Sequence, residues 1–349
     1  MSRPTSLELG RAALRELSPY DPANEQCRID LSDNTNLWGA PPSARAAIAR
    51  ADSEALTRYP APYSRELTRT LADYLGVDAN MIVVGCGSDD VLDSAIRAFG
   101  EPGARLAHLD PTFGMIPVFG TLNGLSVVAI PGDDSRAAEA LLGAGASVIY
   151  LCSPNNPTGE LIDASAIETV VSRANGIVIV DEAYAEFAGV SSIDLLGRYD
   201  NLLITRTLSK AFGLAGLRIG YAAGSSAVVR EVEKSRGPYK VNSLAERAAM
   251  AAITDDRAWV EAKIQEACAN RTRFMERLRA LGLKPIESSA NFVLVPVGES
   301  REIGSRMVRA GVAVRVLENL TGIGDALRIS IGPWPMMEEC LAALEVALQ

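Results

Sequence analysis

Short apolar runs alternate with amphipathic stretches through the middle of this 349-residue chain, and this alternation limits the possible folds most strongly. The apolar runs lie at residues 81–85, 126–130, 147–152, 176–180, 201–204 and 219–223. Helix-like segments separate several of them, at residues 91–99, 133–142 and 164–174. Continuous apolar strands joined by helices are typical of a parallel sheet covered on both faces. We therefore predict an α/β fold with a mostly parallel mixed sheet sandwiched by helices.

The pattern changes after about residue 243. Residues 244–280 read as one long, charged, amphipathic helical stretch. Strand candidates follow at residues 291–297, 311–316 and 326–331, with helices at 300–309 and 336–348. This mixture predicts a smaller α+β domain. The expected organisation is an N-terminal arm at residues 1–37 that packs with the small domain, a large domain at 38–243, and a small C-terminal domain at 244–349.

Charge and composition exclude several classes of partner. The formal net charge is −9 and no basic cluster interrupts it, so we expect neither nucleic acid nor a membrane as a partner. No run of about 18 apolar residues predicts a membrane span, and the first residues do not resemble a secretory signal. The five cysteines are scattered without metal-ligand spacing, as in a cytoplasmic protein with free thiols.

The chain contains one histidine, His108. A Ser-His-Asp or Cys-His triad would have to use it, and a histidine-rich zinc site is impossible. Proton transfer is therefore expected from Lys, Tyr, Asp, Glu or a cofactor.

The stretch RTLSKAFGLAGLRIGY at residues 206–221 holds the strongest chemical signal. It places Lys210 among small and apolar residues, after a hydroxyl-rich turn that includes Thr207 and Ser209. An apolar pocket favours the neutral amine, which can attack an aldehyde. Two hydroxyls and the nearby Arg218 suit a phosphate group. Taken alone, the pattern also fits an ordinary surface lysine on a loop.

This stretch closely resembles the S-K-x-x-G-x-x-G-x-R-x-G signature of fold-type I aminotransferases that use pyridoxal 5′-phosphate (PLP). The resemblance implies that Lys210 carries the cofactor, and that Thr207, Ser209 and Arg218 bind its phosphate. It implies the PLP-dependent transferase fold type I and likeness to class I/II aminotransferases.

Segments upstream of Lys210 fit the same family. Gly87, Ser88 and Asp89 follow a predicted strand and open a helix, whose N-terminal amides suit an anion. A purely structural turn explains these residues equally well. We expect the Asp89 and Asp90 side chains to cap the helix or turn away, leaving backbone amides to bind phosphate.

Two further turns carry polar residues at strand ends. By resemblance to the family's N-P-T-G element, Asn156 binds the oxygen on the cofactor ring; the alternative is an ordinary turn. Asp181 ends a buried strand and fits a carboxylate that keeps the ring nitrogen protonated, although a helix cap is the alternative. Tyr184 follows three residues later and could reach the same ring oxygen.

An aromatic residue and a tyrosine complete the implied cofactor site. Phe113 resembles the family's ring-stacking aromatic, whereas core packing would be the ordinary role of an isolated Phe. Tyr59 resembles a tyrosine that reaches the cofactor phosphate of the neighbouring chain. The resemblance therefore implies a homodimer with shared sites.

The substrate residues are expected mainly in the C-terminal domain. Arg328 resembles the arginine that binds the α-carboxylate of an amino acid. Arg315 resembles a residue of histidinol-phosphate aminotransferases that helps to bind the substrate phosphate; its alternative role is a structural ion pair. Tyr20 and Asn156 are the other expected substrate contacts.

The resemblance implies a transferase that moves the amino group of histidinol phosphate to 2-oxoglutarate, with Lys210, Asp181 and Tyr184 as catalytic residues. The segment at residues 31–38, LSDNTNLW, departs from that subfamily because its usual acidic position is not acidic and Leu37 and Trp38 are bulky.

The departure leaves alternatives open: an aromatic amino acid aminotransferase, a decarboxylase of the threonine-phosphate type, or a non-enzymatic regulator with this fold. A nicotinamide-dependent dehydrogenase is disfavoured because its G-x-G-x-x-G fingerprint is missing after the first strand.

Overall fold

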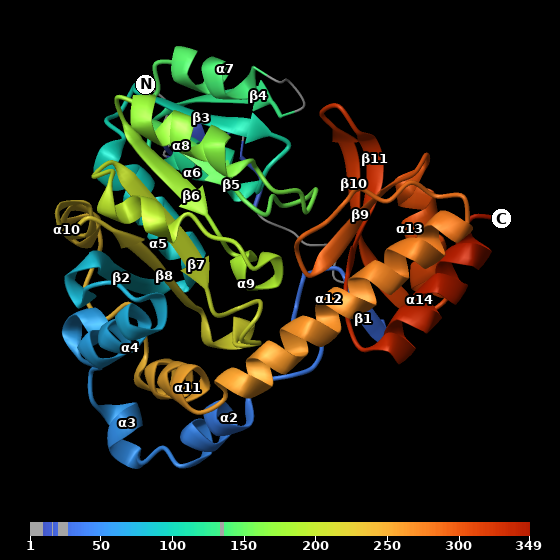
Figure 1. Cartoon of the computed structure of the whole chain (residues 1–349), viewed down its shortest axis with the longest axis horizontal. Coiled ribbons are helices and arrows are strands. Elements are labelled where there is room, and N and C mark those ends of the chain that lie inside the picture. The colour runs from blue at the N-terminus through green and yellow to red at the C-terminus, as the bar shows by residue number, and fades with distance from the viewer. Residues whose placement is uncertain (1–9, 16, 20–26, 133–135) are drawn as a thin grey trace, which may run out of the picture.

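The fold is that of a computed structural model, which describes residues 10–15, 17–19, 27–132 and 136–349. Its two β-sheets belong to two units that lie side by side, joined by one long diagonal helix (Figure 1). The larger unit holds seven strands and the smaller unit four.

The large sheet has the order β2-β8-β7-β6-β5-β3-β4. Its strands are β2 (Ile82–Cys86), β3 (Arg105–Asp110), β4 (Ser126–Pro131), β5 (Val148–Cys152), β6 (Ile177–Asp181), β7 (Leu202–Thr207) and β8 (Ile219–Gly224). Strands β3 to β7 run parallel, whereas β8 is antiparallel to both β7 and β2. This arrangement confirms the predicted α/β class with a mostly parallel mixed sheet.

Helices cover both faces of this sheet because its strands are apolar on both sides. Along β5, for example, Val148 and Tyr150 face one hydrophobic core and Ile149 and Leu151 face the other. One face is covered by α5 (Gly87–Phe99), α6 (Met115–Leu122) and α10 (Ser226–Lys234). The other is covered by α4 (Arg65–Leu75), α7 (Ala137–Gly143), α8 (Ala164–Arg173) and α11 (Ser243–Thr254). The other helices before α10 are α2 (Pro42–Ala49), α3 (Ser53–Thr57) and α9 (Ala185–Ala188).

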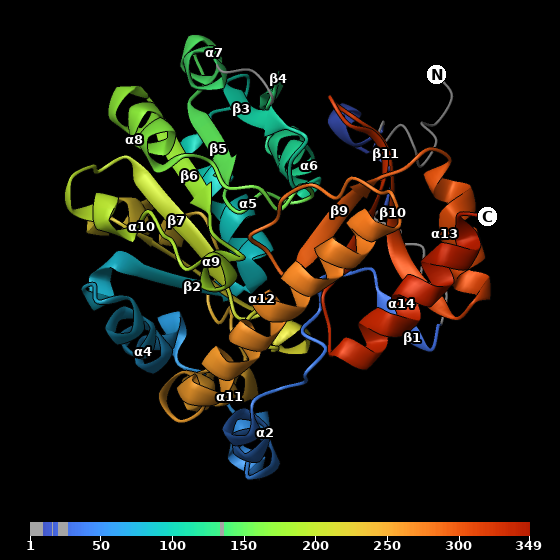
Figure 2. The same cartoon turned by 45° about the vertical axis from the view of Figure 1, so that its right-hand side comes forward.

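The smaller unit packs two helices and part of a third against one sheet. Its strands have the order β1-β10-β11-β9, with β1 (Ile29–Leu31), β9 (Phe292–Pro296), β10 (Val312–Leu320) and β11 (Gly324–Ser330). Helices α13 (Ser300–Arg309) and α14 (Trp334–Ala347) share its core with the C-terminal half of α12 (Arg257–Ala280). Figure 2 shows α12 crossing from beside α11 to this sheet.

The predicted helical stretch at 244–280 is two helices rather than one. The helix is interrupted between α11 and α12, where Asp256 lies. The Asp256 carboxylate accepts hydrogen bonds from the Ser43 amide at 2.6 Å and from the Ser43 hydroxyl at 3.0 Å. Helix α11 packs against α2 and α4 of the larger unit although it follows residue 243.

The N-terminal segment contacts both units. Strand β1 pairs in parallel with β10 of the smaller unit, whereas Arg11 donates to the carbonyl of Leu122 at the end of α6. The boundaries at residues 37 and 243 stay predictions. The predicted helix 133–142 appears as α7 from Ala137, and residues 133–135 lie outside the described residues.

Among the described residues, none of the helices combines the length and apolar character that a membrane crossing requires.

Gly220 on β8 allows the start of α5 to lie directly against the sheet. A Cβ atom at this position would stand 2.0 Å from the Ser88 amide nitrogen, which is backbone and cannot rotate away. We expect Gly220→Ala to lower the free energy of unfolding by about 1–3 kcal/mol, measured by chemical denaturation. Gly298→Ala is the matched control, because a Cβ there meets nothing within 4 Å. Equal stability of the two variants would contradict this reading.

Candidate active site

The candidate site lies at the carboxyl ends of the parallel strands, on the edge that faces the smaller unit (Figure 1). Asp181 is the last residue of β6, and Asn156 lies in the loop after β5. Lys210 follows the end of β7 by three residues. Because parallel strands end at the same edge of a sheet, side chains distant in sequence meet there.

Lys210 is held between the two units. Its Nζ donates a hydrogen bond to the Asp33 carbonyl at 3.1 Å and lies 5.9 Å from the centre of the Tyr184 ring. Burial, reinforced by the positive charge of Arg328, lowers the pKa of Lys210 to about 8. The amine is therefore easier to deprotonate than an ordinary lysine, as a nucleophile or base requires.

Asp181 is a buried carboxylate with a defined partner. It accepts hydrogen bonds from the Tyr150 hydroxyl at 2.8 Å and from the Ala183 amide at 3.2 Å. Burial raises its pKa to about 6, and the Tyr150 hydrogen bond opposes that rise. Sequence reasoning missed Tyr150, because a tyrosine within the apolar strand β5 resembles an ordinary core residue.

Tyr184 is also buried, and burial raises its pKa. Its hydroxyl accepts a hydrogen bond from the Asn34 side chain at 3.0 Å. Asn34 is fixed in turn, because its amide donates to Ser330 at 2.8 Å and its carbonyl accepts from Asn291 at 3.0 Å. Asn34 is a second residue that the sequence analysis did not select.

The start of α5 and Arg218, which follows the turn after β7, lie against each other in an arrangement suited to an anion. Arg218 crosses the helix start so closely that a Cβ on Gly87 would lie 2.5 Å from its Nη2. Helix α5 has no side-chain cap, and the first amides of a helix lack intrahelical acceptors, so the start of α5 is suited to an anion. These features fit a phosphate group.

The two carboxylates at the start of α5, Asp89 and Asp90, differ in their contacts. Asp90 turns back to accept from the Cys86 amide at 3.0 Å, as expected. Asp89 does not cap the helix or turn away but accepts from Arg218 at 3.3 Å, so the expectation for its side chain was wrong. The guanidinium attracts the carboxylate across the helix start, and a bound phosphate would compete with it for Arg218.

Thr207 and Ser209, the two hydroxyl residues of the turn before Lys210, are buried. The Thr207 hydroxyl accepts a hydrogen bond from the Ser209 amide at 3.1 Å, and it lies 3.3 Å from the Ile219 carbonyl to which it donates. These bonds fix the turn that presents Lys210.

Two arginines reach the site from the smaller unit. Arg315 on β10 and Arg328 on β11 are direct partners in the antiparallel register, which places them on the same face of the sheet. Arg328 donates to the Asn156 side chain at 2.6 Å and to the Ser32 carbonyl at 2.7 Å. Arg315 forms an ion pair with the Asp33 carboxylate. Both guanidinium groups therefore contact the segment that follows β1.

The remaining predicted residues lie around this centre or outside the described chain. Phe113 is half-buried and packs on the core beneath α5 and α6. Tyr59 is 83% exposed and stacks on Tyr239 with ring centres 4.9 Å apart. Their roles at the cofactor stay predictions. Tyr20 lies outside the described residues.

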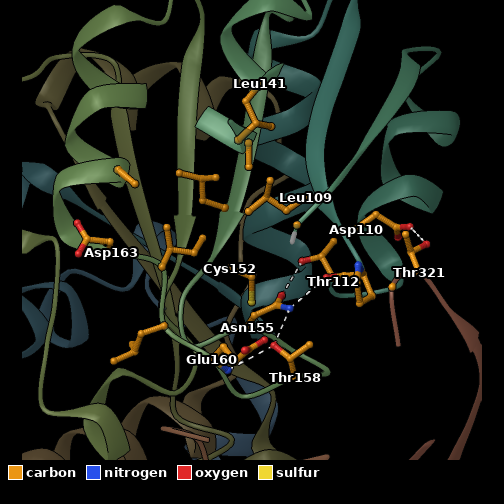
Figure 3. Close-up of a pocket in the computed structure, with 18 of the residues that line it drawn as sticks. Leu109, Asp110, Thr112, Leu141, Cys152, Asn155, Thr158, Glu160, Asp163 and Thr321 are labelled. Carbon is orange, nitrogen blue, oxygen red and sulfur yellow. Dashed lines mark hydrogen bonds between the residues drawn. The ribbon is translucent and has the colours of Figure 1, made fainter. Parts of the chain in front are cut away.

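A cavity of about 480 Å³ opens on another part of the interface between the units (Figure 3). Its lining includes Asp110, whose carboxylate accepts from Thr321 at the tip of the β10–β11 hairpin, and Asn155, which accepts from Thr112 at 3.0 Å. Neither Lys210 nor Asp181 is among the described residues that line it. The cavity is therefore distinct from the candidate site.

The hydrogen bond from Tyr150 can be tested through the titration of Asp181. We expect Tyr150→Phe to raise the pKa of Asp181 in the cofactor-free protein by about one pH unit, because the charged form loses a donor. Carboxyl ¹³C NMR would follow the titration, with Asp181→Asn for assignment. Tyr199→Phe is the control, since that hydroxyl donates to Glu168 instead. An unchanged or lower pKa in Tyr150→Phe would refute the assigned role.

Comparison with known proteins agrees with this geometry. The family model for aminotransferase class I and II matches residues 28–344. The chain is 31% identical over 347 residues to histidinol-phosphate aminotransferase 1 of Nostoc sp., covering 97% of this chain and 98% of that relative.

Solved structures show the same architecture. The histidinol-phosphate aminotransferase of Sinorhizobium meliloti in complex with pyridoxal-5′-phosphate has a TM-score of 0.89 at 27% identity and covers 100% of this chain and 98% of that one. The L-threonine-O-3-phosphate decarboxylase of Porphyromonas gingivalis has a TM-score of 0.81 at 23% identity, covering 92% of this chain and 99% of that one, which shows the fold alone. Because the family match spans nearly the whole chain, the protein belongs to the aminotransferases of class I and II.

Proposed function

We propose that this protein is a PLP-dependent aminotransferase that transfers the amino group of histidinol phosphate to 2-oxoglutarate, giving imidazole acetol phosphate and glutamate. The observation that carries the proposal is the convergence of Lys210 with Arg315 and Arg328, which joins an activated amine to two anion-binding groups. The relatives named histidinol-phosphate aminotransferase support the same substrate.

The residues present fit the cofactor. When bound, PLP supplies an aldehyde and a protonated ring that withdraws electrons from the donor. Asp181 would hold the proton at the ring nitrogen, since its buried carboxylate can pair with a cation there. Arg218 and the first amides of α5 would hold the phosphate, and Asn156 and Tyr184 are proposed partners of the ring oxygen.

Lys210 would carry the proton in the transfer step. Its lowered pKa leaves a larger neutral fraction near pH 7 than an ordinary lysine has, so it can accept the proton from the donor Cα and return it. Tyr184 and the Asp33 carbonyl limit the positions that its amine can take. Tyr184 is buried, and its ring limits the access of water to the Lys210 amine on that side.

The arginine pair suits both substrates of the proposed reaction. 2-Oxoglutarate carries two carboxylates, and histidinol phosphate carries one phosphate dianion. Two guanidinium groups side by side can bind one anion each or share a larger one. The same site can therefore serve both half-reactions.

The unusual residues at 37 and 38 pack away from this chemistry. Leu37 lies against Gly332, where a Cβ would come within 2.7 Å of the Leu37 side chain. Trp38 packs against both hydrophobic cores. Their bulk therefore fills the junction of the two units, and it gives no specific support to the aromatic amino acid alternative.

A second copy of the chain is the proposed partner. Tyr59, Tyr63 and Tyr239 are exposed around the segment that resembles the shared-site element of the family. A homodimer would cover these rings. The cytoplasmic location stays a prediction from the sequence.

The proposed substrate predicts a specific response to amino donors. The purified holoenzyme should change its cofactor absorbance with histidinol phosphate, and more weakly with phenylalanine or tyrosine. A response to the aromatic donors alone would favour the aromatic aminotransferase. Release of carbon dioxide from threonine phosphate would favour the decarboxylase. The control is Lys210→Ala, which should give no covalent cofactor adduct after borohydride reduction; a stable adduct would refute the assignment of Lys210.

The two arginines should differ in their effect on donors. We expect Arg315→Gln to raise KM for histidinol phosphate by about tenfold or more, because a charge-assisted bond to phosphate is lost, with a smaller effect on phenylalanine. Arg328→Gln should impair both donors. Steady-state kinetics on both variants would measure this, with Arg301→Gln, which removes an exposed ion pair with Glu318, as control. Equal losses for both donors in Arg315→Gln would contradict the assigned role.

A further inference from the structure

One of the two arginines proposed to bind the substrate anion, Arg315, already has an acidic partner in this structure. The Asp33 carboxylate forms an ion pair with Nη2 of Arg315. The arginine side chain is 18% exposed, whereas the aspartate side chain is 52% exposed. The carboxylate therefore occupies part of the Arg315 guanidinium and is itself the partner more open to solvent, so an anion that binds Arg315 would meet it.

The backbone around Asp33 is fixed by the site itself. The carbonyl of Ser32 accepts from Arg328 at 2.7 Å, the carbonyl of Asp33 accepts from Lys210 at 3.1 Å, and the amide of Asn34 donates to Ser330 at 2.8 Å. Three consecutive residues are thus anchored to groups that line the site. The Asp33 side chain is consequently presented to Arg315 by a held backbone rather than by a free loop.

The charged groups near the Asp33 carboxylate indicate that it would compete with an incoming anion. The positive charges of Arg328 and Arg218 help to lower the pKa of the Lys210 amine, and the Asp33 carboxylate opposes them. An incoming phosphate or carboxylate would meet Arg315 already neutralised. It would also experience repulsion from the Asp33 carboxylate if both anions shared the same guanidinium.

We propose that Asp33 is a specificity determinant whose carboxylate competes with the anionic tail of the substrate for Arg315. The inference rests on the proposed function for the identity of the donor, but the competition itself concerns only Arg315 and an anion. A half-exposed ion pair is weak enough to be displaced. A phosphate dianion can displace it by making stronger charge-assisted bonds, at a reduced net affinity. A donor without an anionic tail would be unaffected.

In the opposite role, the Asp33 carboxylate would hold the Arg315 guanidinium in the orientation that binds phosphate. The two roles predict opposite results. If Asp33 competes, its removal strengthens anion binding; if it orients, its removal weakens binding.

The direct test is calorimetric titration of the holoenzyme with inorganic phosphate, in phosphate-free buffer at matched ionic strength. We expect Asp33→Asn and Asp33→Ala each to lower the phosphate Kd by about two- to fivefold, the range expected for losing one partly exposed ion pair. Two variants are used because Asn keeps the shape of the side chain and Ala removes it. The thermal midpoint of each variant verifies that it is folded.

A matched control stands on the same strand as Arg315. Glu318 on β10 pairs with Arg301 rather than with Arg315, so Glu318→Gln removes one negative charge from the smaller unit without uncovering Arg315. Its phosphate Kd should equal that of the unaltered protein. The double variant Asp33→Asn with Arg315→Gln should lose the gain seen in Asp33→Asn, because the arginine that would be uncovered is missing.

Kinetics provide the second readout. KM for histidinol phosphate should fall in Asp33→Asn, whereas KM for histidinol, the same donor without phosphate, should not. Unchanged or weaker phosphate binding in both Asp33 variants would overturn the inference. If the unaltered enzyme fails to use histidinol phosphate, the proposed substrate is wrong, but the calorimetric comparison still decides whether Asp33 competes for Arg315.

Discussion

The segment from Leu31 to Asn36 joins the two units at the point where the chemistry is proposed to occur. Leu31 pairs with Val314 in the small sheet, and Asn36 donates to the Ala211 carbonyl at 3.0 Å in the turn that carries Lys210. Between them, Asn34 contacts Tyr184 of the larger unit and Ser330 of the smaller one. Six residues therefore fix the distance between the lysine and the arginine pair. Without this connection, the two halves of the site would depend on packing alone for their alignment.

This dependence explains why the segment is polar although much of it is buried. Ser32, Asn34 and Asn36 are each at most 9% exposed. Buried polar groups are costly unless they are paired, and hydrogen bonds pair these residues with backbone or side chains from both units. A purely apolar segment could pack as well but would not specify one register between the units. The polar bonds therefore define the geometry in which Lys210 faces the arginines.

The sequence was sufficient to predict the sheet class and the central lysine, but not the partners that tune the site. The apolar runs located the strands because a buried parallel strand is a continuous run of apolar residues. The motif around Lys210 could be identified because all of its residues lie within one short stretch of sequence. Tyr150 could not be selected, because a tyrosine within an apolar strand looks like core until its hydroxyl is seen beside Asp181. Asp33 and Asn34 were read only as part of a divergent motif. Their contacts depend on the pairing of β1 with β10, nearly 300 residues away along the chain, which no local pattern encodes. The prediction of one long helix after residue 243 was wrong for a similar reason, because the residue between the two helices, Asp256, bonds to Ser43, which lies far away in the sequence.

The two units contribute different charged groups to the site. The larger unit supplies the carboxylate Asp181, whose pKa burial raises, and the smaller unit supplies the cationic Arg328, which helps to lower the pKa of Lys210. The Lys210 shift depends in part on the smaller unit, because Arg328 contributes to it, whereas the Asp181 shift arises from burial in the larger unit. Separating the units would rehydrate Lys210 and return its pKa toward that of an ordinary lysine. The pKa of Lys210 therefore depends on the contact between the two units. The polar segment at residues 31–36 maintains that contact through its backbone and its hydrogen bonds.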